Sequence, residues 1–168
     1  MYEVSIRRAT PADRPAVASL LSASDLSSEG VDPELAGFAV AERNGVLVGV
    51  AGLERYGDDG LLRSVAVAGD SRGLGLGARL TRAVLDDARS RGLAGVYALT
   101  TTAERYFPRL GFEVIERSDV PAPVRESLEF RSLCPSSAIA LRLNLSAVTR
   151  QPSASTVGAR DRKLKAEG

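Results

Sequence analysis

The most informative stretch of this chain is Asp70-Ser71-Arg72-Gly73-Leu74-Gly75-Leu76-Gly77-Ala78-Arg79-Leu80. An apolar run over residues 61–67 precedes it, and apolar residues at helical spacing follow it as far as residue 88. The order is therefore strand, glycine-rich turn and helix. Glycines let the backbone approach a ligand closely, and the first N–H groups of a helix have no partner inside the helix. We therefore predict that residues 70–80 cradle an anion.

Two common nucleotide loops fit these residues poorly. A P-loop ends in Gly-Lys-Ser or Gly-Lys-Thr to hold phosphates and magnesium, whereas this loop ends in Gly77-Ala78-Arg79. A dinucleotide fingerprint reads Gly-x-Gly-x-x-Gly at the start of a βαβ unit. Here the glycines are Gly73, Gly75 and Gly77, and they follow three strands of antiparallel type. A plain turn without a ligand is the remaining alternative, and the order of strands around the loop argues against it.

Size and charge predict one domain and a tail. The chain has 168 residues, of which 44% are hydrophobic, enough for a substantial core. Its net charge is +1, but residues 147–168 hold five basic and two acidic residues, a charge of +3, which leaves −2 for the rest. A nucleic-acid-binding domain would carry a basic face, so no nucleic acid partner is expected. We expect one domain over residues 1–146 and a disordered basic tail over residues 147–168.

The chain has no histidine and one cysteine, Cys134. These counts exclude a histidine-containing triad, a histidine-ligated metal and a thiolate zinc site, so no metal is expected. The absence of an intrachain disulfide suits the cytoplasm, which is the predicted location. The N-terminal residues do not resemble a signal peptide, and no apolar run approaches the length of a membrane span. Cys134 is interpreted as structural, because a lone thiol without a histidine is a weak candidate nucleophile.

Apolar periodicity, turn residues and caps predict the order of elements. Asn44-Gly45 indicates a tight hairpin turn, and Arg91-Gly92 closes the helix after the loop. A short helix is also expected at residues 33–35. The expected strands are 4–8, 38–42, 46–54, 61–67, 95–100, 112–115 and 137–145, and the expected helices are 11–24, 76–88, 101–110 and 121–130.

The fragment Arg72-x-x-Gly75-x-Gly77 and this element order resemble the GNAT superfamily of acyl-CoA-dependent N-acetyltransferases over residues 4–145. The resemblance implies an α/β fold with a mixed, strongly twisted sheet of six to seven strands and helices on both faces. It implies acetyl-CoA as cosubstrate. Val65 and Val67 would pair with its pantetheine arm through their backbones, where the sheet splays between strands 61–67 and 96–100. Its pyrophosphate would be held by the backbone of Arg72, Gly73, Leu74, Gly75, Leu76 and Gly77.

A second motif of the superfamily falls on residues 103–112. Many members read Ala-x-x-[Phe/Leu]-Tyr-x-x-x-Gly-Phe there, and their tyrosine is the proposed general acid for the leaving thiolate. In this chain Phe107 occupies that position and Tyr106 lies one residue earlier. One residue is about 100° of helix rotation, so Tyr106 is interpreted as a core or rim aromatic. The thiolate would then leave with help from water or the backbone.

Residues 52–57, 61–67, 99–107 and 131–138 resemble a narrower group, the arsenic-resistance N-acetyltransferases. These are similar to the acetyltransferase domain of N-acetylglutamate synthase. The resemblance implies a small amino-acid-like amine as acceptor, with an arsenical amino acid as one candidate. It also implies a homodimer, since GNAT proteins often pair through their C-terminal strands.

An amine attacks in its neutral form, so the site needs a proton acceptor. Glu54, expected at the end of its strand, is the candidate base, and a solvated strand-end glutamate is the alternative. Arg63 or Ser64 could hold a substrate carboxylate. Strand alternation places Arg63 on the face of Val65 and Ser64 on the opposite face. Two further candidate acceptor contacts are Thr100 and Arg131.

The sequence thus predicts an acetyl-CoA-dependent N-acetyltransferase that acts on a small primary amine. Two alternatives stay open. One is a non-catalytic acetyl-CoA-binding regulatory module, which stays open because Phe107 replaces the tyrosine that is the proposed general acid. The other is a peptide or protein N-acetyltransferase, which would need the segment over residues 25–37 to leave an open groove.

Overall fold

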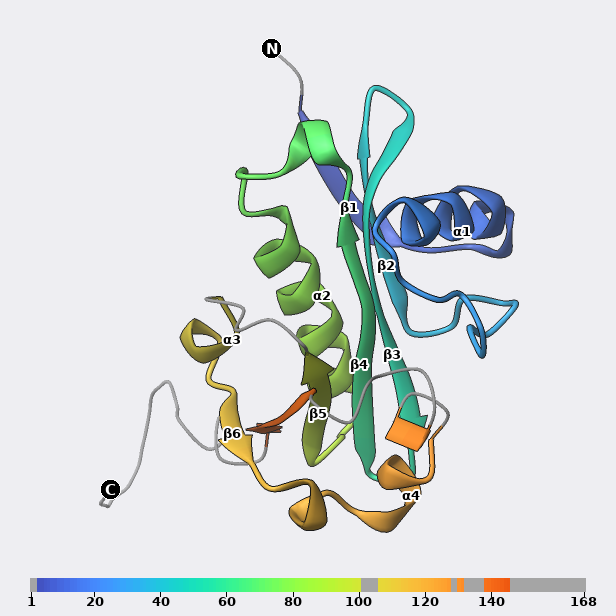
Figure 1. Cartoon of the computed structure of the whole chain (residues 1–168). Coiled ribbons are helices and arrows are strands. Elements are labelled where there is room, and N and C mark those ends of the chain that lie inside the picture. The colour runs from blue at the N-terminus through green and yellow to red at the C-terminus, as the bar shows by residue number, and fades with distance from the viewer. Residues whose placement is uncertain (1–2, 101–105, 128–129, 132–137, 146–168) are drawn as a thin grey trace.

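The computed structural model describes residues 3–100, 106–127, 130–131 and 138–145, and these form one mixed sheet with helices on both faces (Figure 1). The sheet has seven strands in the order β1-β2-β3-β4-β5-β7-β6. Neighbouring strands are antiparallel except β4 and β5, which are parallel. The predicted α/β architecture is confirmed.

The elements follow the predicted order along the chain. The strands are β1 (Val4–Arg8), β2 (Phe38–Arg43), β3 (Val46–Tyr56), β4 (Asp59–Val67), β5 (Gly95–Thr100), β6 (Glu113–Ile115) and β7 (Ile139–Asn144). The α-helices are α1 (Arg14–Ala23), α2 (Leu76–Ser90), α3 (Tyr106–Arg109) and α4 (Ala122–Arg125). Short 3-10 turns lie at Pro11–Asp13, Gly69–Ser71 and Arg117–Asp119.

The two long helices cover opposite faces of the sheet (Figure 1). Side chains along a strand alternate between faces. On β2, Val40 packs in the cluster that contains Leu21 of α1, whereas Ala41 packs in the cluster that contains Leu80 of α2. Gly49 on β3 lets α2 come close, since a Cβ there would lie 2.7 Å from the Leu80 side chain.

Two tight hairpins connect β2, β3 and β4. The predicted turn at Asn44-Gly45 has positive φ at both residues, 55° and 76°, as a type I′ turn requires. The second turn is tighter than expected. Tyr56 pairs with Asp59 across a two-residue turn, with Gly57 at φ 68°. β3 therefore runs two residues past Glu54, so this glutamate does not end its strand.

β4 and β5 pair only over part of their length. Their register runs from Asp59 opposite Gly95 to Leu62 opposite Ala98, although β4 continues to Val67. Among the described residues, the β5 side of β4 has no strand partner from Arg63 onward. The predicted splay is present, and it begins at Arg63.

Several predicted helices are shorter than expected. Of the helix predicted over residues 121–130, α4 follows Pro121 and ends at Arg125, the described residues 126–127 are not helical, and helical geometry returns at residue 130. The predicted helix at residues 33–35 is wrong, because this part is a turn with Leu35 at φ 56°, outside the helical region. Of the helix over residues 101–110, only α3 falls in the described part of the chain. The predicted tail lies outside it.

Candidate active site

A β-bulge interrupts β4 at the start of the splay. Gly52 of β3 pairs with Arg63, and Val50 pairs with Ala66, so the two residues Ser64 and Val65 lie opposite the single residue between Val50 and Gly52. Ser64 has φ 60°, in the left-handed region that residues other than glycine rarely adopt. A bulge of this kind inserts one residue and bends the strand.

The bulge corrects the prediction about which side chains share a face. Alternation predicted Arg63 with Val65 and Ser64 on the other side. In the structure Arg63 donates from Nε to Ser64 Oγ at 3.0 Å, so these two side chains meet. Val65 packs instead against the cluster under α2. The extra residue shifts the phase of the strand by one, which reverses every face assignment after it.

Glu54 lies at the centre of a group of four polar residues. Arg63 Nη1 donates to Glu54 Oε2 at 3.0 Å, and the Tyr56 hydroxyl donates to Glu54 Oε1 at 2.8 Å. With Ser64 bonded to Arg63, these residues form what we call the Glu54 cluster: Glu54, Tyr56, Arg63 and Ser64. All four members lie on β3 or β4, so these two strands together position the cluster beside the splay.

Burial sets the electrostatics of the Glu54 cluster. The Arg63 side chain is 2% exposed and that of Glu54 is 19% exposed. A buried guanidinium needs a carboxylate and further acceptors, because water does not solvate it there. Burial, and then the hydrogen bond to Glu54, raises the pKa of Tyr56 to about 12. Tyr56 is therefore a neutral hydroxyl at physiological pH and donates to the glutamate.

Tyr56 was not among the predicted site residues. A signal for it exists in the sequence, because residues two apart on a strand share a face, and Tyr56 follows Glu54 by two. The signal was hidden because Tyr56 was assigned to a turn. Pairing of Tyr56 with Asp59 extends the strand and brings the hydroxyl onto the glutamate.

The predicted anion loop has the geometry of a helix start without a side-chain cap. Gly73 and Gly75 have φ of 83° and 74°, a conformation that favours glycine. α2 begins at Leu76, with no capping side chain among the described residues, and its first helical bond runs from Arg79 N–H to the Gly75 carbonyl at 3.1 Å. The N–H groups before Arg79 lack partners within the helix and carry its positive dipole end.

The loop is also tied back to the end of β4. Arg72 Nε donates to the Val67 carbonyl at 3.0 Å. Val65 and Val67 are half-buried on the α2 side of the sheet, past the point where β5 pairing stops. The structure therefore brings the loop beside the open stretch of β4.

The remaining predicted residues lie on other elements. Thr100 ends β5 and pairs with Ile139 of β7. Arg131 is exposed, and its backbone N–H donates to the Ser127 carbonyl at 3.0 Å. Cys134 lies outside the described residues.

The sequence and the fold match those of known proteins over most of the chain. A model of the acetyltransferase (GNAT) family matches residues 6–112. The chain belongs to the acetyltransferase (GNAT) family. It is similar to the amino-acid acetyltransferase of Neisseria meningitidis, with 29% identity over 138 residues, covering 77% of this chain and 31% of that protein. The chain thus spans about a third of the length of this curated relative.

Solved structures give the same relationship. N-acetylglutamate synthase from Neisseria gonorrhoeae, complexed with coenzyme A and N-acetyl-glutamate, has a TM-score of 0.71 at 26% identity, covering 85% of this chain and 35% of that one. Protein Rv2747 from Mycobacterium tuberculosis, in complex with CoA, has a TM-score of 0.69 at 27% identity, covering 83% of this chain and 98% of that one.

Within this GNAT domain, Phe107 is a core residue. It is buried, and its ring meets Phe112 edge to face, with centroids 5.4 Å apart. A phenylalanine at the position where many members carry tyrosine therefore contributes packing. The side chain of Tyr106 lies outside the described part, so its predicted role stays a prediction.

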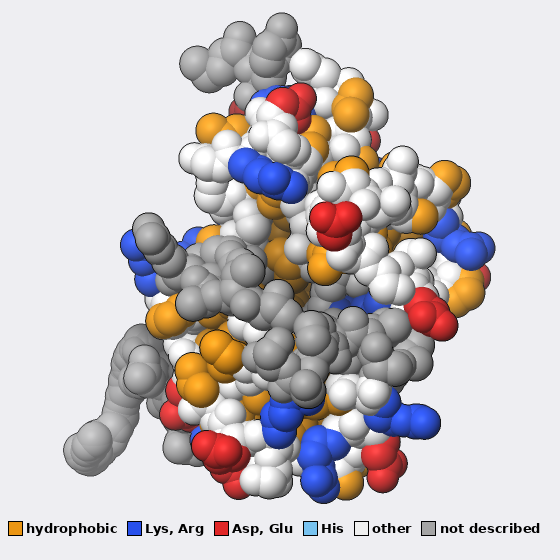
Figure 2. All heavy atoms as spheres, viewed as in Figure 1, with side chains coloured by type: hydrophobic (Ala, Val, Ile, Leu, Met, Phe, Trp, Pro, Cys, Tyr) orange, Lys and Arg blue, Asp and Glu red, His pale blue; other side chains and the backbone are white. Residues whose placement is uncertain are grey.

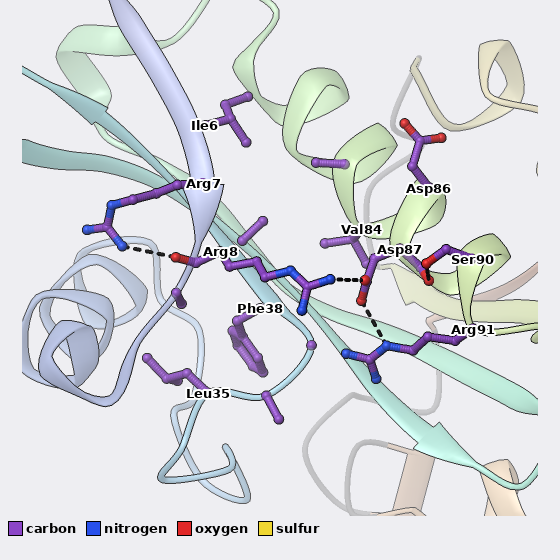
Figure 3. Close-up of a pocket in the computed structure, with 15 residues that line it drawn as sticks. Ile6, Arg7, Arg8, Leu35, Phe38, Val84, Asp86, Asp87, Ser90 and Arg91 are labelled. Carbon is purple, nitrogen blue, oxygen red and sulfur yellow. Dashed lines mark hydrogen bonds and ion pairs between the residues drawn. The ribbon is translucent and has the colours of Figure 1, made fainter.

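A cavity of about 500 Å³ in this GNAT domain lies apart from these residues, between β1, the segment before β2, and α2 (Figure 3). Arg8 reaches across it from β1 and donates to Asp87 Oδ1 at 2.7 Å, and Asp87 also binds Arg91. No predicted site residue lines this cavity. The pair between Arg8 and Asp87 joins β1 to α2.

Charged side chains of both signs are interspersed over the face in Figure 2. Among the described residues, no cluster of three or more cysteine or carboxylate side chains could hold a metal ion. No helix in the same part of the chain is long and apolar enough to cross a membrane.

Proposed function

We propose that this protein transfers the acetyl group of acetyl-CoA directly to the primary amine of a small, amino-acid-like substrate. One observation carries the proposal. The Glu54 carboxylate is bonded to Arg63, the residue at which β4 parts from β5, so a candidate base lies where the sheet opens. Family membership and the CoA complexes of two similar proteins support acetyl-CoA as the donor.

Acetyl-CoA supplies the activated acyl group as a thioester. We assign its pyrophosphate to the backbone of residues 72–77, because the unpartnered N–H groups at the start of α2 suit an anion. We assign its pantetheine arm to the backbone groups of Val65 and Val67, on the open stretch of β4. Arg72 would border both parts, since it already contacts the Val67 carbonyl.

The proposed reaction uses Glu54 to remove a proton from the amine, directly or through a water molecule. The amine nitrogen then bonds to the thioester carbonyl carbon, the C–S bond breaks, and CoA leaves as a thiolate that takes its proton from solvent. Phe107 has no proton to give. A backbone N–H near Val65 would polarise the carbonyl, and the rest of the rate would come from positioning.

Ser64, Thr100 and Arg131 are the proposed acceptor contacts. The exposed guanidinium of Arg131 suits a substrate carboxylate, because its planar donors match two carboxylate oxygens. The similarity to amino-acid acetyltransferases, and to a synthase complexed with N-acetyl-glutamate, supports an amino acid as acceptor. We include arsenical amino acids, and thus a role in arsenic resistance, among the candidates.

The test is release of free CoA from acetyl-CoA with a panel of amines: glutamate, other amino acids, phosphinothricin, arsenical amino acids, polyamines and short peptides. The expected result is turnover with one class of amino acid that is lost in Glu54→Gln while acetyl-CoA binding is kept. Turnover with peptides alone would favour a peptide N-acetyltransferase.

The buried Phe107 favours one other candidate, a non-catalytic acetyl-CoA-binding module in the cytoplasm. Tight acetyl-CoA binding with no turnover across the panel would support it. We also propose a homodimer, which light scattering of the purified protein would detect as twice the mass of the chain.

A further inference from the structure

Arg63 donates its hydrogen bonds to the protein itself. Besides Ser64 and Glu54, its Nη2 donates to the carbonyl oxygens of Glu29 at 2.9 Å and Ser27 at 3.5 Å. Those carbonyls lie 34 and 36 residues earlier in the chain. A guanidinium has five N–H donors, so these four bonds commit most of them. Arg63 therefore joins the segment after α1 to the Glu54 carboxylate.

The segment that Arg63 holds has local bonds that report on its order. Val31 N–H donates to the Ser28 carbonyl at 3.2 Å, and Leu35 N–H donates to the Asp32 carbonyl at 2.8 Å. Leu35 is buried in the cluster under α1, but residues 27–29 are exposed. The buried guanidinium thus gives the exposed part of the segment a long-range polar anchor.

Tyr56 lies on the other side of Glu54. Its hydroxyl donates to Glu54 at 2.8 Å, and the Ser127 side chain lies close enough to lower the pKa of that hydroxyl. Ser127 is buried and accepts the backbone N–H groups of Arg131, at 3.0 Å on its carbonyl, and of Phe130, at 3.3 Å on its Oγ. The backbone of residues 27–29 is therefore connected to Glu54 through Arg63, and Ser127 lies beside the tyrosine that binds the same carboxylate.

We propose that Arg63 and Tyr56 are positioning residues that hold the backbone of residues 27–29 and the residues 127, 130 and 131 near Glu54, so that the candidate base is fixed relative to the chain around it. The inference rests on the proposed function in one respect, that Glu54 serves as the base. It reassigns Arg63 from a substrate-carboxylate contact to the frame of the site. The Arg63 guanidinium binds Glu54 and two backbone carbonyls, so it does not contact the reacting atoms.

Hydrogen exchange of the Val31 and Leu35 amides in the full chain tests the Arg63 half of the proposal without any ligand. Arg63→Met and Arg63→Lys should both exchange about tenfold faster at these amides, because lysine keeps the charge for Glu54 but not the fork that spans two carbonyls. Arg7→Met, which removes another arginine that joins distant residues, is the matched control and should leave them unchanged. Equal exchange in Arg63→Met and the wild type would overturn this half.

Kinetics with L-glutamate and phosphinothricin as amines test the second half. Tyr56→Phe keeps the ring and loses the hydroxyl, and it should raise KM for the amine about tenfold while KM for acetyl-CoA stays unchanged. Exchange at the Phe130 and Arg131 amides should rise in the same variant. Unchanged exchange there would overturn the role of Tyr56. If the wild type acetylates neither amine, the acceptor proposal fails, and the exchange measurements still decide the positioning roles.

Discussion

Two arginines, Arg7 and Arg63, each join residues far apart in the sequence, and they differ in their surroundings. Arg7 on β1 binds both Asp13 and Glu42 at 2.9 Å, with its side chain 36% exposed. Arg63 on β4 binds Glu54 at 3.0 Å, with its side chain 2% exposed. Water screens an exposed pair, which then contributes little, whereas a buried guanidinium depends on every partner. Arg7 binds the residue that precedes α1, and Arg63 holds the Glu54 cluster together.

The largest expected difference is in kcat, between variants of the two glutamates that bind these arginines. Glu54→Gln removes the proposed base and should lower kcat for amine acetylation about 100-fold or more. Glu42→Gln loses only a partly exposed pair and should leave kcat within about twofold. Steady-state CoA release measures both rates, and equilibrium binding of acetyl-CoA should be the same in the two variants. Equal kcat values would remove Glu54 from the proposed chemistry.

The two arginines should also differ in how much each contributes to the free energy of unfolding. Arg63→Met strips the charge from a buried pair and should lower the free energy of unfolding by about 3 kcal/mol. Arg7→Met should lower it by about 1 kcal/mol or less, because solvent screens that pair. Urea unfolding of each variant at neutral pH gives the two values. A loss for Arg7→Met as large as that for Arg63→Met would mean that burial does not distinguish them.

The contribution of the Arg7–Asp13 pair to stability should depend on pH. The hydrogen bond from Arg7 lowers the pKa of Asp13 from 3.8 to about 2. A lowered pKa stabilises the fold above the unfolded value, so this contribution is complete above about pH 4 and is lost as the pH falls through 2. The free energy of unfolding of the wild type should exceed that of Asp13→Asn by about 1 kcal/mol at neutral pH. This difference should shrink as the pH falls. A difference that is constant with pH would contradict the assignment.

The smallest effect is expected at Tyr56, on the Arg63 side of the comparison. Its pKa of about 12, against 10.0 for a free tyrosine, stabilises the fold below pH 10, and this contribution is lost as the pH rises through 12. Ultraviolet titration of tyrosinate, with Tyr56→Phe subtracted, should locate this pKa. In Glu54→Gln it should fall toward 10 but stay above it, because burial is the larger cause. An unchanged value would show that Glu54 does not act on the hydroxyl.

Local patterns predicted most elements because their causes are local. Asn44-Gly45 specifies a hairpin turn through its own backbone preferences, and apolar spacing after Gly75 marks α2. The helix predicted over residues 121–130 is present at Ala122–Arg125, and residues 130–131 are again helical. Apolar spacing indicated that Val124 faces the core, but it did not indicate that residues 126–127 leave the helix.

The family, the glycine-rich turn before α2 and the choice of Glu54 as a candidate base followed from the sequence alone, because each depends on residue types at short, fixed spacing. The contacts that hold the Glu54 carboxylate became known only from the folded structure. The bulge at Ser64 depends on the pairing of two strands, and it places Val65 on the face of the sheet opposite Arg63. The partners of Arg63 come from another segment of the chain, and burial by that segment makes the pair consequential. Long-range pairing and burial are properties of the folded chain, and no local pattern encodes them.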